Sequence, residues 1–199
     1  MRDLSRLDGR IRGTVVVAGV GVAGRGDDAA GSMLAQRLRR AGVPAIDCGD
    51  RPEDVTGEIA QAKPDTIVIV DAVEMGAGGG DVAVFGADEA LDRGCDTHNA
   101  SLATLMRYLE MRTGATVLLL GIQPAAIADT PALSPAVAGA LDLLEEWFVA
   151  ACAASPPERE SGEGDPDPAA CPSAGSGHGE LVEPCGRGPA PVPGHAPPP

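Results

Sequence analysis

Uninterrupted apolar runs punctuate the first three quarters of the chain. They are rich in Val, Ile and Leu, which is typical of strands buried on both faces. The strand candidates are residues 14–18, 43–47, 66–70, 81–85 and 115–120. The first, third and fifth runs are the strongest, and they end at Gly19, Asp71 and Gly121. We therefore expect a sheet of about five strands.

Between these runs, apolar residues recur at every third or fourth position, which is typical of helices packed on a sheet. The expected helices cover 28–41, the segment from Asp50 to Lys63, 88–93, the segment from Asn99 to Gly114, and the segment from Ser134 to Cys152. Asp50 and Asn99 are suitable N-terminal caps. The alternation of strands and helices predicts a three-layer α/β/α fold with a mostly parallel, twisted sheet.

The apolar pattern stops near Ala154. The last segment contains 12 of the 18 prolines, no aromatic residue, and two of the three histidines. Such a composition cannot bury enough surface to offset the entropy of ordering. We predict an N-terminal extension over 1–12, one α/β domain over 13–153, and a disordered Pro/Gly-rich tail over 154–199.

Charge and composition exclude several classes of function. The chain has 29 acidic and 15 basic residues, a net charge of −14, and only four aromatic side chains. An acidic surface with few stacking platforms argues against nucleic-acid binding. No apolar run is long enough for membrane insertion, and the charged N-terminus does not resemble a signal peptide. Five cysteines without even spacing favour reduced thiols, so we expect a cytoplasmic protein.

Three segments should meet at one edge of the predicted sheet, because ligands of such folds bind outside the carboxyl ends of the strands. They are Gly19–Asp28, Asp71–Met75 and Gly121–Pro124. The first contains a G-x-G-x-x-G pattern at Gly19–Gly24, and Asp47 follows at the spacing of a dinucleotide-binding fold. However, Asp27 and Asp28 would face the pyrophosphate. The other interpretation is a tight turn in which Asp27 or Asp28 caps the next helix.

The same edge offers candidate metal ligands. Asp28 follows the first strand, Asp71 ends the central strand, and His98 is the only histidine in the predicted domain. Two carboxylates and an imidazole can bind a divalent transition metal and leave positions open for water or substrate. A capping or surface role for each residue remains the alternative, because the three are far apart in sequence.

These segments resemble the hydrogenase maturation proteases, the nickel-dependent endopeptidases that trim nickel–iron hydrogenase large subunits. The matching pieces are Val17-Ala-Gly-Val-Gly21 with Gly26-Asp-Asp28, Ile69-Val-Asp71-Ala with Met75-Gly76, Thr97-His98-Asn99, and Gly121-Ile-Gln-Pro124. They occur in the family's order within residues 14–153, and they are most similar to members of the formate hydrogenlyase type.

The resemblance implies that Asp28, Asp71 and His98 hold Ni2+ and form the catalytic site. The nickel would arrive with the substrate, a nickel-loaded large-subunit precursor, and would serve in recognition; Zn2+ or Cd2+ are candidate substitutes in vitro. The enzyme would remove the precursor's C-terminal peptide and act as a monomer. The chain departs from the family at Val22, where the family usually has Asn, so loop geometry or specificity differs there.

The sequence contains no evident nucleophile set. Cys48, Cys95 and Cys152 have no second histidine in the domain to activate them, which favours metal-assisted hydrolysis. Asp27 is a candidate base or a partner that orients the site. Two other functions remain open: a nucleotide-binding module that uses Gly19–Gly24, and a chaperone that binds the precursor without cleaving it.

The predicted tail has its own possible ligands, which are Cys171, His178, Cys185 and His195. Their spacing matches no zinc signature, so we expect a disordered appendage rather than a second metal site.

Overall fold

The computed structural model of the chain describes residues 7, 9–92, 97–125 and 130–154, and only the backbone at 91, 92 and 97–100. These residues belong to one compact unit. Its centre is a five-stranded sheet in the order β2-β1-β3-β5-β4. The strands are β1 (Val15–Val20), β2 (Ala45–Gly49), β3 (Thr66–Ala72), β4 (Val82–Phe85) and β5 (Thr116–Ile122). Only β4 is antiparallel to its neighbour, so the predicted mostly parallel sheet is confirmed.

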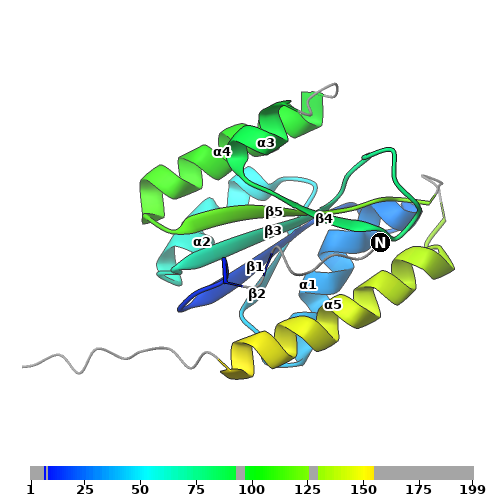
Figure 1. Cartoon of the computed structure of the whole chain (residues 1–199), viewed down its shortest axis with the longest axis horizontal. Coiled ribbons are helices and arrows are strands. Elements are labelled where there is room, and N and C mark those ends of the chain that lie inside the picture. The colour runs from blue at the N-terminus through cyan, green and yellow to red at the C-terminus, as the bar shows by residue number, and fades with distance from the viewer. Residues whose placement is uncertain (1–6, 8, 93–96, 126–129, 155–199) are drawn as a thin grey trace, which may run out of the picture. The chain divides into compact units, whose positions relative to one another are not determined.

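Helices cover both faces of the sheet, as Figure 1 shows. They are η2 (Gly26–Ala29), α1 (Ala30–Arg40), η3 (Pro52–Val55), α2 (Thr56–Gln61), α3 (Ala87–Asp92), α4 (Thr97–Thr113) and α5 (Pro135–Ala154). In Figure 1, α1 and α5 lie below the sheet, and α3 and α4 lie above it. The α/β/α layers expected from the sequence are therefore present.

Two apolar clusters fill the spaces between the layers. Alternate residues of each strand point to opposite faces, so Val68 and Val70 pack with α1 and α5, whereas Ile67 and Ile69 pack with α2 and α4. Phe148, with 0 % of its surface exposed, anchors α5 in the first cluster. Burial of β3 on both faces explains why its sequence is an uninterrupted apolar run.

Helix α1 lies unusually close to the sheet. Gly31 in α1 packs on the backbone at the ends of β1 and β3, and a Cβ at this position would lie 2.1 Å from the Val70 carbonyl oxygen. A Cβ on Gly19 would lie 2.0 Å from the Gly31 carbonyl oxygen. This glycine pair brings the start of α1, together with η2, down to the carboxyl end of β3.

Three capping predictions were wrong. The N-cap position of η3 is Arg51 rather than Asp50, and it makes no side-chain capping bond. Helix α4 begins at Thr97, so Asn99 lies within its first turn. Neither Asp27 nor Asp28 caps a helix, because Arg25 and Ala29 occupy the N-cap positions of η2 and α1.

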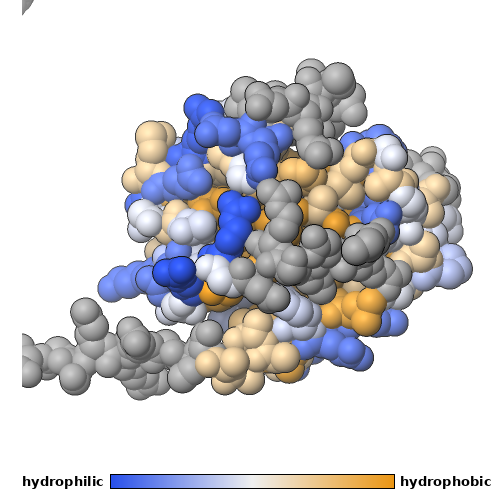
Figure 2. All heavy atoms as spheres, viewed as in Figure 1, coloured by the Kyte–Doolittle hydropathy of each residue, from blue (hydrophilic) through white to orange (hydrophobic). Residues whose placement is uncertain are grey.

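The chain before β1 joins the packing of the unit. Leu7 is fully buried in the cluster between the sheet and α1 and α5. The Arg12 N–H donates to the Thr66 hydroxyl at 3.1 Å, and that hydroxyl donates to the Arg12 carbonyl at 2.9 Å. The predicted tail over 154–199 lies outside the described residues, apart from Ala154. Among the residues that are described, no helix is both long and apolar enough to cross a membrane. Figure 2 shows weakly hydrophobic surface over the C-terminal end of α5, where Ala150, Ala153 and Ala154 are exposed.

Candidate active site

Asp71 lies at the carboxyl end of the central strand β3. It is paired in register with Gly121 of β5, one residue beyond the pair formed by Val70 and Leu120. Its Oδ1 accepts a hydrogen bond from the Ala72 backbone N–H at 2.8 Å. Burial raises the pKa of Asp71, that hydrogen bond lowers it and the negative charge of Asp28 raises it, so that the pKa lies at about 7. The charged form of Asp71 is therefore unfavourable at this position when no cation lies beside it.

Asp28 reaches the same place from the loop after β1. It lies in η2, which contacts β3, and its side chain is partly exposed. A side chain at Gly21 would collide with the Asp28 carbonyl oxygen at 2.2 Å, so the glycine loop folds tightly against η2. The structure therefore brings two predicted ligands together, although 42 residues lie between them in the sequence.

His98 lies in the first turn of α4. This helix ends at Thr113, three residues before β5 begins, so α4 runs antiparallel to β5 and its first turn faces the carboxyl edge of the sheet. The side chain of His98 lies outside the described residues. Among the side chains that are described, no three His, Cys, Asp or Glu residues are grouped to hold a metal ion.

Asp27 is buried with 1 % of its surface exposed, and it links η2 to the segment after β5. Its Oδ2 accepts a hydrogen bond from the Ala125 N–H at 2.9 Å, and its Oδ1 accepts one from the Ser134 N–H at 2.7 Å. Both oxygens are thus engaged by backbone donors. This arrangement disfavours Asp27 as a general base and fits the alternative of an orienting role.

Gln123 is a residue whose role the sequence analysis missed. It is 3 % exposed, and its Oε1 accepts hydrogen bonds from the N–H groups of Met75 at 2.7 Å and Ala77 at 3.2 Å. Its Nε2 donates to Glu74 Oε1 at 2.9 Å. The buried side-chain amide of Gln123 therefore joins the segment after β5 to the segment after β3. A glutamine directly after an apolar strand was the available signal.

Four backbone amides of the glycine loop and the turn after it are already hydrogen-bonded within the protein. The N–H of Gly21 donates to the Gly49 carbonyl at 2.8 Å, and the N–H of Gly26 donates to the Thr130 carbonyl at 2.6 Å. The N–H groups of Arg25 and Asp28 are bonded within the turn. Since dinucleotide binding depends on such groups, the loop favours a structural turn.

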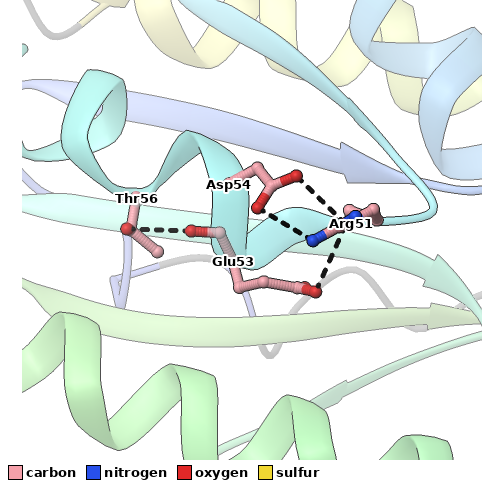
Figure 3. Close-up of polar contacts among 4 residues, drawn as sticks. All are labelled: Arg51, Glu53, Asp54 and Thr56. Atoms are coloured by element: carbon pink, nitrogen blue, oxygen red, sulfur yellow. Dashed lines mark hydrogen bonds and ion pairs between the residues drawn. The ribbon is translucent and has the colours of Figure 1, made fainter.

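Asp47, the acidic residue of the dinucleotide pattern, is also engaged within the protein. Asp47 accepts hydrogen bonds from Ser32 Oγ and Gln36 Nε2, both at 2.7 Å. Burial alone would raise the pKa of Asp47, but these bonds and the Gly49 N–H outweigh it and lower the pKa. Figure 3 shows that Arg51, the cation after β2, lies between Glu53 and Asp54, with Nε 3.0 Å from Asp54 Oδ2. Neither charge is left for a nucleotide.

The two described cysteines are poor nucleophiles. Burial raises the pKa of Cys48 to about 12, and the charges of Asp47 and Glu58 add to this effect. Burial also raises the pKa of Cys152. Both cysteines therefore remain protonated thiols near neutral pH, which disfavours either of them as the nucleophile.

Comparison with known proteins identifies the family. The model of the HycI hydrogenase maturation protease family matches residues 30–151. The chain belongs to the hydrogenase maturation proteases. It is 32 % identical to the hydrogenase 3 maturation protease of Escherichia coli over 142 residues, which cover 67 % of this chain and 90 % of that protein. The predicted resemblance is thereby confirmed.

Solved structures of the hydrogenase maturation proteases share the fold. The protease HycI of Thermococcus kodakarensis has a TM-score of 0.64 and 30 % identity, and the match covers 72 % of this chain and 94 % of that one. The endopeptidase HycI of Escherichia coli has a TM-score of 0.61 and 29 % identity, and covers 69 % and 90 %. The protein described here is accordingly a hydrolase, an endopeptidase of hydrogenase maturation.

Proposed function

We propose that this endopeptidase removes the C-terminal peptide from a nickel-loaded hydrogenase large-subunit precursor, and that Asp28, Asp71 and His98 bind the nickel. The observation that supports the proposal most is the meeting of Asp28 and Asp71 at the carboxyl end of β3. The three residues come from three separate connections of the fold, all at the carboxyl edge, where such folds bind ligands.

The residues present fit a divalent metal. Asp71 is partly buried and lies beside a second carboxylate, so charging it without a counter-ion is unfavourable. A divalent cation would offset this repulsion, because carboxylate and imidazole donors together suit nickel or zinc. We therefore propose Ni2+ as the physiological metal, delivered with the precursor, and Zn2+ or Cd2+ as substitutes in vitro.

We propose the following roles for the protein groups. A bound metal supplies Lewis acidity for the scissile carbonyl or for a water molecule. Asp28, Asp71 and His98 would orient the precursor's metal-bearing segment. The described cysteines stay protonated and so do not supply a nucleophile. Asp27 has both oxygens engaged, so we assign it no proton transfer.

The decisive experiment is processing of a purified precursor, followed by mass spectrometry. We expect the unmodified chain to shorten the nickel-loaded precursor and to leave the nickel-free precursor intact. His98→Ala and Asp71→Asn should abolish processing while the fold survives. Asp47→Asn is the control, because Asp47 is a hydrogen-bonded carboxylate of β2 that lies outside the proposed site.

The outcomes separate the competing functions. Normal cleavage by His98→Ala or Asp71→Asn would refute the ligand assignment. Precursor binding without any cleavage by the unmodified chain would favour the chaperone. A rise in melting temperature with NAD(P) or ATP, and none with Ni2+, would favour the nucleotide-binding module.

A further inference from the structure

We propose that Asp27 and Gln123 are positioning residues, which together fix the segments that bear Asp28 and Asp71 to the segment after β5. We call this pair of side chains and their backbone donors the loop clamp. The inference rests on the proposed function, because it assigns the clamp the task of holding the two carboxylates at the separation that a metal requires.

The first arm of the loop clamp is Asp27. Its carboxylate spans 98 and 107 residues of sequence to reach the N–H groups of Ala125 and Ser134. Ser134 directly precedes α5, and its hydroxyl accepts a hydrogen bond from the Val137 N–H at 3.3 Å. Asp27 is therefore tied to a rigid helix start. Since Asp28 is the next residue, its backbone position follows from that of Asp27.

The second arm is Gln123, which closes the segment that follows Asp71. Its side chain engages the N–H groups of Met75 and Ala77, and its backbone pairs with the far end of the same segment. The Gly80 N–H donates to the Gln123 carbonyl at 2.8 Å, and the Gln123 N–H donates to the Asp81 carbonyl at 2.8 Å. The connection from Asp71 to β4 is thus held at both ends by one residue.

The placement of the clamp argues for more than stability. A buried carboxylate is costly to desolvate unless it is well hydrogen-bonded, and apolar side chains can join loops without that cost. Here the buried polar groups lie at the carboxyl edge, next to both proposed ligands. Groups that orient metal ligands typically affect metal affinity or activity about 10- to 100-fold when changed.

The amino edge of the sheet provides a matched control. Thr66 at the start of β3 is also 1 % exposed, and its hydroxyl both accepts from and donates to the backbone of Arg12. Thr66→Val removes two hydrogen bonds from a buried polar side chain without changing its shape. It is far from Asp71 along the same strand, so it reports the loss of stability alone.

The test uses the full chain and the substitutions Asp27→Asn, Gln123→Glu and Thr66→Val. Asp27→Asn retains one acceptor and turns an NH2 group toward a backbone donor. Gln123→Glu loses the donor to Glu74 and sets a like charge beside it, so repulsion should move the new carboxylate away from the N–H groups of Met75 and Ala77. Three quantities are measured for each: melting temperature without metal, Ni2+ affinity by calorimetry, and the rate of precursor processing below the melting temperature.

We expect all three variants to melt earlier than the unmodified chain. Ni2+ affinity and processing should fall about 10- to 100-fold for the two clamp variants and remain unchanged for Thr66→Val. Amide hydrogen exchange should accelerate at Ala125 and Ser134 in Asp27→Asn, and at Met75 and Ala77 in Gln123→Glu.

Two results would overturn the loop clamp. One is unchanged Ni2+ affinity and processing in variants that melt earlier, which would leave only a structural role. The other is unchanged amide exchange at the four named positions. Failure of the unmodified chain to bind Ni2+ and to cleave would instead count against the proposed function, and the exchange measurements would still decide whether the clamp holds the segments.

Discussion

Asp71 is a source of instability in the chain without metal. Because the pKa of Asp71 in the folded state is about 7, the folded chain keeps a proton on this carboxyl group between about pH 4 and pH 7, where the unfolded chain has lost it. The folded pKa is raised, so the contribution of Asp71 to stability falls as the pH rises from about 4 to about 7. Asparagine has the same shape, can still accept the hydrogen bond from Ala72, and never acquires the charge.

We therefore expect Asp71→Asn to stabilise the metal-free chain above pH 7. The gain in the free energy of unfolding should be about 2 to 4 kcal/mol at pH 8 and should vanish near pH 4. Denaturant unfolding at a series of pH values measures this difference. Asp50→Asn, on the exposed surface after β2, is the control and should follow the unmodified chain throughout. A gain that does not depend on pH would contradict the explanation.

Single residues also show how far the sequence could lead. The proximity of Asp28 and Asp71 was predictable, because Asp28 follows one strongly apolar strand, Asp71 lies at the end of another, and the carboxyl ends of parallel strands lie together. The sequence left Asp27 as either a base or an orienting residue, and its partners were not predictable, because they lie about 100 positions away and are backbone groups, which are the same for every sequence. The contacts of Gln123 were hidden for the same reason.

At the scale of elements, the contact between α1 and the sheet determines where η2 lies. Gly31 allows the helix to rest on the carbonyl oxygens of Val20 and Val70, at the ends of β1 and β3. No other residue type fits there without movement of the helix. The loop after β1 can therefore lie close to Asp71 because residue 31 is a glycine and has no side chain.

Gly31→Ala should consequently lower both stability and processing. Its Cβ would lie 2.1 Å from one backbone oxygen and 2.3 Å from another, and neither can rotate away. Overpacking of this kind typically costs about 1 to 3 kcal/mol, and displacement of η2 should slow precursor processing as well. Thermal unfolding and the mass-spectrometric assay measure the two effects.

Gly57→Ala is the matched control for this prediction. Gly57 lies in α2, and nothing lies within 4 Å of the position its Cβ would take. Alanine is the better helix former by about 1 kcal/mol, so this variant should melt at the same temperature or higher. If Gly31→Ala were as stable as Gly57→Ala, close approach of α1 would not matter.

The order of elements was predictable from periodicity, whereas their ends were not. Apolar spacing identified all five strands and the main helices within a few residues. Asp50 and Asn99 are both good caps by composition, yet the chain places Pro52 and Thr97 at the start of the respective elements. Capping preference is worth only about 1 kcal/mol, so packing against the sheet decides the boundary. The antiparallel direction of β4 likewise depends on a contact with β5 that no local pattern encodes.

At the scale of the whole molecule, the family match and the described core both lie in the part of the chain before Ser155. The family match ends at residue 151, and α5 ends at Ala154. Helix α5 is essential to the layer beneath the sheet, because Val137, Leu141 and Phe148 are fully buried there. The proposed processing reaction draws only on residues of this part.

We predict that a chain ending at Ala154 keeps the melting temperature and the processing rate of the full chain. A chain ending at Glu146 should fail to fold stably. It loses Phe148, whose removal alone typically costs about 3 to 5 kcal/mol, and also Trp147, whose ring meets Phe148 edge-to-face with centroids 5.1 Å apart. Phe148→Ala in the longer chain separates the loss of this side chain from the loss of the last helical turns. Should the chain ending at Ala154 fold but process the precursor more slowly, the segment after Ala154 would have to take part in binding the precursor, and the predicted disordered tail would gain a function.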